Sequence, residues 1–279
     1  ALFEDSSGTF WVGSWGGALS IFDRETGQAV KHYMPDPQDP ESIINSQSVW
    51  RILEDREAPN ILWLGTRGGG LDRFDKQTER FTHYAYDPQN PHSLSHNEVW
   101  TIYDTGQGVL WLGTTEGLNK FEKRTGKCTR YIYQSENPEQ LNANRVIHIH
   151  ADRTDDTILW LATDGGGLLR FNTATETFEK QYTTQYGLPH NNVLTILEDT
   201  PQLPDAPHTL WLGTSGGIAR FTPDTETVRV YEGNTGTTMV VTLGAGLQTC
   251  DGEMFFGTTQ GLYRFHPQGI RENQHIPPV

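Results

Sequence analysis

The chain has 279 residues and a formal net charge of −14, because 35 Asp and Glu outnumber 21 Lys and Arg. This balance argues against nucleic acid as a partner, since neutralising phosphates requires clustered Lys and Arg. No stretch approaches the roughly 18 consecutive apolar residues of a membrane-spanning helix, so we expect no membrane insertion by this segment. With 29 Gly, 8 Trp and 10 Tyr, the composition indicates a turn-rich protein with aromatic cores and not a disordered one.

One short pattern recurs six times along the chain. It is an apolar run with an aromatic residue inside it, then Gly-Thr, then a turn rich in glycine, as in Leu-Trp-Leu-Gly-Thr-Arg-Gly-Gly-Gly-Leu at 62–71. The aromatic residues are Trp11, Trp63, Trp111, Trp160, Trp211 and Phe255. Ala162 in place of Gly and Phe255 in place of Trp are departures from the pattern that a core tolerates. Similar units that cannot bury their faces alone are expected to form one array.

Each copy is predicted to form four short strands. In the second copy they cover 48–55, 61–66, 70–75 and 80–86, and a polar hairpin at 76–79 joins the last two. The glycines let the second and third strands pass close together. Connections between copies are longer and several are rich in Pro, which ends strands because it donates no ladder hydrogen bond. The six copies are expected at about 1–34, 46–87, 96–134, 144–184, 191–232 and 237–270.

This organisation predicts an all-β fold, a β-propeller of about six four-stranded blades over 1–270. The propeller has six blades, or seven if it is completed by sequence missing from the chain. The alternative fold is a solenoid or a sandwich. The repeated aromatic residues would lie between blades. Residues 1–5 carry no Met and no signal-peptide pattern and match the middle of a unit, so we expect a piece of a longer protein. Cys128 and Cys250 fall in different units, and the sequence leaves open whether they are free.

The repeated residues resemble a known family. Val-x-x-Ile-x-Glu-Asp at 49–55, followed by the motif at 62–75, is similar to the two-component regulator propeller repeats, and the resemblance covers about 2–270 in six copies. These repeats form sensor regions of bacterial hybrid histidine kinases. The tail at 271–279, with its Pro-Pro-Val, resembles the exit linker that leads in that family to a β-sandwich domain. The resemblance implies a periplasmic part of an inner-membrane receptor, with a carbohydrate-derived ligand, an adjacent β-sandwich domain and a dimeric receptor.

Signals for catalysis are poor. The chain has no Gly-x-Ser-x-Gly, no His-Glu-x-x-His, no phosphate-binding loop and no Cys-x-x-Cys, so we expect no catalytic residue, no metal and no cofactor. The turn at 5–11 resembles the Asp-box of sialidases, but Asp and Gly also make an ordinary hairpin turn there. His148 and His150 lie on one side of a strand. They are two ligands, too few for a metal site, and the alternatives are ligand contact or ordinary strand polarity.

Propeller geometry predicts where a ligand binds. The first strand of each blade lines the central channel, and the turns after the second strands surround its mouth together with the loops between blades. One first-strand position is polar in five copies, which predicts that it faces the channel: Arg51, Thr101, His148, Thr195 and Thr242. An apolar residue follows it and is expected in the blade core: Ile52, Ile102, Ile149, Ile196 and Leu243.

The residue at the position after Gly-Thr varies between copies, with five residue types in six positions, which is typical of a binding face on a repeat scaffold: Trp15, Arg67, Thr115, Asp164, Ser215 and Thr259. Trp15 is expected either to stack on a sugar ring or to pack under a neighbouring loop. Asn residues at the strand entrances either contact the ligand or form turns. The candidate ligand-binding residues are Trp15, Arg67, Asp164, Arg51, His148, His150, Asn97, Asn144 and Asn191. A ligand-sensing module is the first hypothesis, and a propeller lyase or a protein-binding scaffold is the alternative.

Overall fold

The structure is a computed structural model that describes residues 1–44, 46–134, 143–199, 208–231 and 239–270. It is an all-β six-bladed β-propeller built mostly of four-stranded antiparallel sheets, which confirms the predicted fold class. Each blade is one sheet, and its strands follow one another in chain order. The chain divides into two compact units, Ala1–Ile149 and His150–Val279. The predicted exit linker at 271–279 lies outside the described residues.

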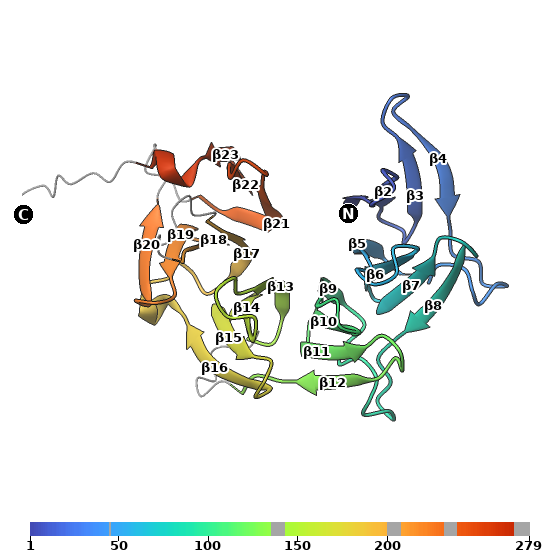
Figure 1. Cartoon of the computed structure of the whole chain (residues 1–279), viewed down its shortest axis with the longest axis horizontal. Helices are drawn as coiled ribbons and strands as arrows, with labels where there is room; N and C mark the ends of the chain where they lie inside the picture. Colours follow the sequence, from blue (N-terminus) through green and yellow to red (C-terminus); the bar gives the residue numbers. More distant parts are fainter. Residues whose placement is uncertain (45, 135–142, 200–207, 232–238, 271–279) are drawn as a thin grey trace, which may run out of the picture. The chain divides into compact units, whose positions relative to one another are not determined.

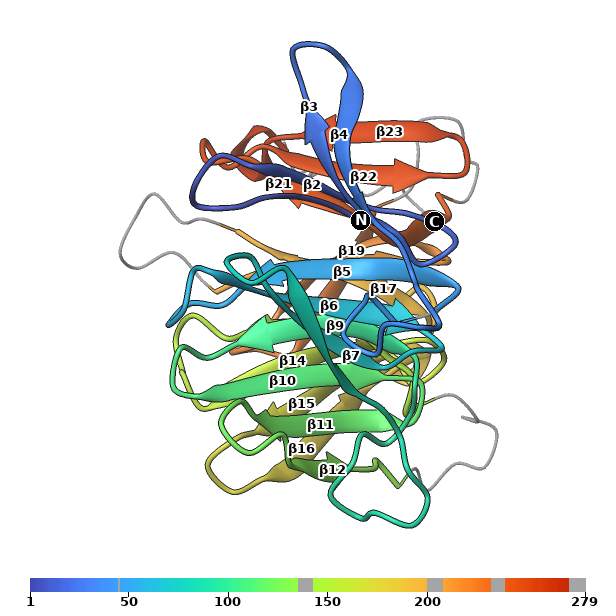
Figure 2. The same ribbon diagram turned by 90° about the vertical axis from the view of Figure 1, so that its right-hand side faces the viewer.

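Unit 1 contains three four-stranded blades (Figure 1). Blade 1 comprises β1 (Leu2–Glu4), β2 (Phe10–Gly13), β3 (Leu19–Asp23) and β4 (Gln28–Tyr33). Blade 2 comprises β5 (Ser48–Glu54), β6 (Ile61–Arg67), β7 (Leu71–Asp75) and β8 (Arg80–Tyr84). Blade 3 comprises β9 (Val99–Asp104), β10 (Val109–Thr114), β11 (Gly117–Glu122) and β12 (Cys128–Tyr131), which lie side by side in Figure 2.

The remaining blades follow the same order. Blade 4 begins with β13 (Val146–Ala151), the strand in which the boundary between the units falls, and continues with β14 (Ile158–Thr163), β15 (Leu168–Asn172) and β16 (Thr177–Tyr182). A short 3-10 helix, η1 (Thr184–Tyr186), follows it. Blade 5 comprises β17 (Val193–Glu198), β18 (Leu210–Thr214), β19 (Gly217–Thr222) and β20 (Thr227–Tyr231). Blade 6 comprises β21 (Val241–Gln248), β22 (Met254–Thr258) and β23 (Gly261–Phe265).

Blade 6 departs from the prediction in two ways. It has three strands among the described residues, because after β23 the chain turns at Pro267 into the 3-10 helix η2 (Pro267–Gly269). Its first strand is also irregular, since residues 242–245 lie between the pairs Val241–Thr258 and Gly246–Phe256. The predicted place of Leu243 in the blade core is therefore wrong, and this side chain is 50% exposed.

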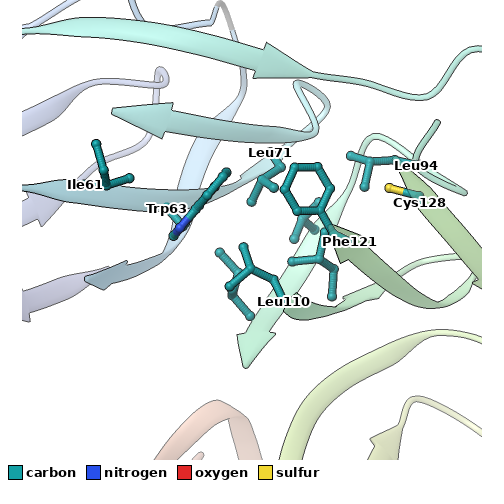
Figure 3. Packing of buried hydrophobic residues seen from close by; sticks show 10 residues of the cluster. Ile61, Trp63, Leu71, Leu94, Leu110, Phe121 and Cys128 are labelled. Atoms are coloured by element: carbon teal, nitrogen blue, oxygen red, sulfur yellow. The ribbon is translucent and has the colours of Figure 1, made fainter. Parts of the chain in front are cut away.

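The repeated tryptophans lie between blades, as predicted. Trp63 of blade 2 packs edge-on against Phe121 of blade 3, with ring centroids 5.4 Å apart. The cluster around them includes Leu110 and Cys128 and is shown in Figure 3. In unit 2, Trp160 packs in the same way against Phe221 at 5.5 Å. The aromatic residue of the motif therefore joins one blade to the next.

Two glycines of the motif are required by close packing. A Cβ at Gly65 would lie 2.9 Å from the carbonyl oxygen of Val99, in the first strand of the next blade. Gly70 has a φ of +89°, which L side chains rarely adopt, and a Cβ there would collide with the carbonyl oxygen of Tyr84. These two glycines therefore allow close approach to the next blade and to the fourth strand, whereas the sequence indicated the second and third strands.

Candidate ligand-binding surface

The loop before each first strand and the turn after each second strand lie at the same end of a blade, because successive strands run antiparallel. In unit 1 this end links one blade to the next. The N–H of Gly16 in blade 1 donates to the carbonyl of Gln47 at 2.8 Å, and the N–H of Gly68 in blade 2 donates to the carbonyl of Asn97 at 2.9 Å. Trp15 belongs to the first of these turns and Arg67 is the last residue of β6, directly before the second, so the backbone places both at what we call the turn end of unit 1.

Two further tryptophans, which the sequence reasoning missed, occupy the turn end. Val49 and Arg51 pair with adjacent residues of β6, so Trp50 between them is left out of the ladder. Trp100 is left out of the β9–β10 ladder in the same way. A β-bulge re-aims the side chain of its extra residue, and both indoles are half-buried. The available signal was a Trp at the same place in two successive copies, Val-Trp-Arg-Ile at 49–52 and Val-Trp-Thr-Ile at 99–102.

These side chains form a row across the turn end. The Arg67 guanidinium carbon lies 6.0 Å from the ring centroid of Trp15 and 5.5 Å from that of Trp50. The rings of Trp50 and Trp100 are 3.9 Å apart with an interplanar angle of 30°. Arg145, before β13, lies 5.8 Å from Trp100. Cation–π contacts at such distances contribute on the order of 0.5–1 kcal/mol each at exposed sites. They therefore position these side chains but add little to the stability of the fold.

Glu98 and Thr115 connect the row from the other side. The Nε of Arg67 lies 3.4 Å from Oε1 of Glu98, and Oε2 of Glu98 accepts a hydrogen bond from the Thr115 hydroxyl at 2.8 Å. The indole N–H of Trp100 donates to the same hydroxyl oxygen at 2.9 Å. With the Arg67–Trp50 and Trp50–Trp100 contacts, these bonds close a ring of five side chains, of which Arg67 is one.

The three predicted Asn residues fasten loops. The side-chain oxygens of Asn97, Asn144 and Asn191 accept hydrogen bonds from the backbone N–H groups of Tyr86, Tyr133 and Thr184, at 2.6, 2.6 and 2.9 Å respectively. Each Asn also accepts, through its own carbonyl, a glycine N–H from the turn of the preceding blade. Of the two readings left open by the sequence, the contacts favour the structural one.

The polar first-strand position is exposed in some blades and buried in others. Arg51 is exposed and His148 is half-buried, whereas Thr101 and Thr195 are buried. The methyl group of Thr101 fills the space above Gly113, which has no side chain, and Thr195 does the same above Gly213. The prediction that this whole position faces a channel is therefore wrong for the two threonines.

His150 and Asp164 belong to unit 2. His150, near the end of β13, hydrogen-bonds through Nε2 to Glu198 at 3.0 Å, and Glu198 is also paired with Arg153 at 3.2 Å and with His208 at 2.9 Å. Burial would raise the pKa of Glu198, but its bonds with the two histidines lower this pKa to about 2. Asp164 is half-buried in the turn of blade 4, where its backbone pairs with that of Asn192.

The turn that resembles an Asp-box is a structural hairpin. Oδ1 of Asp5 accepts hydrogen bonds from the N–H groups of Ser7 and Thr9, and Oδ2 accepts from the Trp11 indole at 2.9 Å and from Lys76 of blade 2 at 2.8 Å. Burial would raise the pKa of this carboxyl, but these bonds hold it well below its usual range. The carboxylate therefore orients the core tryptophan and joins two blades.

The described residues contain no group of three His, Cys, Asp or Glu side chains that could hold a metal ion. Both cysteines are free, Cys128 buried and Cys250 exposed, and burial raises the pKa of the Cys128 thiol to about 12. No helix within the described ranges has the length and apolar character needed to cross a membrane.

Comparisons with known proteins agree with the repeat pattern. The family model for the two component regulator propeller matches residues 93–116, which include the bulge of Trp100 and the motif of blade 3. Over 270 residues the chain is 25% identical to Histidine kinase P4 of Formosa agariphila. The matched region covers 96% of the chain and 19% of that protein. One stretch of the chain thus matches the two component regulator propeller model, and nearly the whole chain is similar to a histidine kinase.

Solved structures that are similar to this chain share its fold. The extracellular domain of one hybrid two component system of B. thetaiotaomicron has a TM-score of 0.75 and 24% identity, over 98% of the chain and 35% of that domain. A second such domain from the same organism has a TM-score of 0.71 and 20% identity, over 98% of the chain and 36% of that domain. The chain thus spans about a fifth of the length of the kinase and about a third of these domains.

Proposed function

We propose that this propeller is the ligand-sensing part of a two-component receptor, located in the periplasm. It recognises a carbohydrate-derived ligand at the turn end of unit 1 and passes the signal to a membrane-proximal β-sandwich domain of the same chain, in a dimeric receptor. The similarity to a histidine kinase and to extracellular domains of hybrid two component systems supports this proposal.

One observation carries the proposal. The residue after Gly-Thr varies between copies, while the Trp, Gly and Thr residues around it build the blades. In blade 1 this residue is Trp15, which is 75% exposed. An exposed indole at a turn on a rigid scaffold is suited to stacking on the apolar face of a sugar ring. Trp15 is therefore available to a ligand and is not packed under a neighbouring loop.

Signalling then needs a difference in affinity between two receptor states. A ligand shifts the relation between the propeller and the next domain only as far as it binds one arrangement better than the other. The propeller itself contributes binding and no chemical step. A lyase would need a histidine and a carboxylate at the turn end, whereas the carboxylate bonded to His150 is already shared with Arg153 and His208.

A thermal-shift screen of oligosaccharides on this chain tests the proposal. A ligand that binds only the folded state raises stability by about 2.7 kcal/mol at a hundred times its Kd, so the melting temperature rises. Trp15→Ala should remove the shift, and Tyr186→Ala, at another exposed aromatic residue, should keep it. Sequencing beyond this chain in the parent gene should show a membrane span and a kinase region. Turnover of an oligosaccharide by the chain would contradict the non-enzymatic role.

A further inference from the structure

The turn end of unit 1 concentrates positive charge in an acidic chain. Arg67 and Arg145 flank the Trp50–Trp100 pair, and Arg51 is the exposed residue beside Trp50 in β5. The one carboxylate in the row, that of Glu98, already has both oxygens engaged, by Arg67 and by the Thr115 hydroxyl. At Arg67 itself the local charge that a ligand meets is therefore positive, although Glu116 is exposed in the turn of blade 3 and the chain as a whole carries −14.

We propose that Trp15 and Arg67 form a subsite for an acidic saccharide, that is, a sugar ring carrying a carboxylate or a sulfate. The ring lies on the Trp15 indole and the acidic group accepts hydrogen bonds from the terminal amino groups of Arg67. This inference rests on the proposed sensing function and adds to it the class of ligand.

Arg67 is held in place before any ligand arrives. Its Nε faces Glu98 at 3.4 Å and its guanidinium lies near the Trp50 ring, which is packed on Trp100. The Trp100 indole is fixed in turn by its hydrogen bond to Thr115. Because these contacts restrict the side chain, less conformational entropy is lost when it binds a ligand than for a free surface arginine.

The part of Arg67 that faces a ligand is unused. Within the described part of the chain, Nη1 and Nη2 have no hydrogen-bond partner, and the side chain is 38% exposed. A planar guanidinium whose Nε is already engaged still presents its terminal groups to an anionic oxygen pair, which is the geometry that carboxylates and sulfates accept. A neutral sugar would leave these donors without a charged partner, so the site should discriminate in favour of the acidic ring.

The test measures Kd by calorimetry on this chain with matched oligosaccharides. The acidic set contains oligogalacturonate, oligoalginate and chondroitin sulfate oligosaccharides, and the neutral set contains galactan and mannan oligomers of the same lengths. We expect at least one acidic oligomer to bind about tenfold or more tightly than the neutral ones, and to bind more weakly as salt is raised. Uronates and sulfated sugars in separate arms show which anion is preferred.

Variants assign the discrimination to Arg67. Arg67→Gln should weaken binding of the acidic oligomer about tenfold or more, and Arg67→Lys, which keeps the charge without the fork, should restore only part of it. The matched control is Arg170→Gln in unit 2, because Arg170 also lies 6.0 Å from a Trp ring and pairs with a glutamate, Glu179, at 3.0 Å. This control should leave Kd unchanged.

The outcomes separate the two proposals. Equal affinity for neutral and acidic oligomers, or full affinity in Arg67→Gln, would overturn the acidic subsite and leave oligosaccharide sensing standing. Failure of every oligomer in both sets to bind would overturn the sensing proposal and the subsite together. Circular dichroism on each variant checks that it is folded, and Trp15→Phe, which keeps a stacking ring, should retain more affinity than Trp15→Ala.

Discussion

The strand entrances of blades 2 and 5 share a backbone and differ in their side chains. In both, the ladder between the first two strands leaves out one residue, which is Trp50 in unit 1 and Leu194 in unit 2. The residue after the Gly-Thr of the second strand is Arg67 in blade 2 and Ser215 in blade 5. The same bulge and turn thus present an aromatic, cationic surface in one unit and an uncharged one in the other. Scaffold and surface are therefore separable, and substitutions should affect one without the other.

The largest expected effect contrasts two tryptophans. Trp63→Ala should lower the free energy of unfolding by about 3–5 kcal/mol, because it opens a cavity between blades 2 and 3. Trp15→Ala should change it by less than about 0.5 kcal/mol, since the side chain is exposed. Chemical denaturation measures both. A large loss in Trp15→Ala would mean that this residue belongs to the scaffold.

The next contrast uses two glycines of one turn, both with positive φ. Gly68→Ala meets no atom within 4 Å and should cost about 1 kcal/mol, the strain of the backbone conformation. Gly70→Ala carries the same strain and also collides with the Tyr84 carbonyl, so about 3 kcal/mol is expected. Urea titrations of the two variants compare them. Equal losses would show that the fourth strand of the blade moves away at little cost.

A smaller effect is expected at Asn97. Removing its side-chain oxygen leaves the N–H of Tyr86 without its partner, so Asn97→Ala should lose about 1 kcal/mol of stability. Asn97→Asp keeps the acceptor and should lose less. Neither should change the affinity for a saccharide that binds at Trp15. A variant that stays stable but no longer binds would return Asn97 to the ligand site.

The smallest expected effect concerns pH and the cations that join blades. In unit 1, Lys123 of blade 3 pairs with Asp55 of blade 2 at 3.0 Å, but the residue at the place of Lys123 in blade 5 is Pro223. There His208, which is buried, lies 3.5 Å from Asp152 and 2.9 Å from Glu198. Unit 2 thus uses a titratable cation where unit 1 uses a permanent one.

Burial disfavours the charged form of His208, but the contact with Glu198 and the charge of Asp152 outweigh it and raise its pKa above 6.5. A raised pKa in the folded state gives stability that is complete below the unfolded pKa and is lost as the pH rises through the folded pKa. As the pH rises above 6.5, melting temperatures should therefore fall more in the natural chain than in His208→Lys. His83, whose bond to Asp72 also raises its pKa, is unchanged in this comparison. Identical pH profiles would contradict the assignment.

Local chemistry made much of the fold predictable. The recurrence of Leu-Trp-Leu-Gly-Thr fixes strands, turns and the core residues between blades, because every copy needs the same close contacts. The strands of blade 2 were predicted at 48–55, 61–66, 70–75 and 80–86, and they span 48–54, 61–67, 71–75 and 80–84. Blade 6 was less predictable. The extra residues 242–245 in its first strand do not alter the repeated motif, so comparing the copies does not reveal them.

The candidate site shows what sequence determines and what tertiary structure decides. The sequence identified Trp15 and Arg67 because their position varies on a constant scaffold. It could not show that Asn97 fastens a loop or that Thr101 covers a glycine, since those contacts join residues 11 and 12 positions apart. It also gave no reason to place Trp50 and Trp100 beside Arg67. Only the bulge in each first strand and the packing of one blade on the next bring these side chains together.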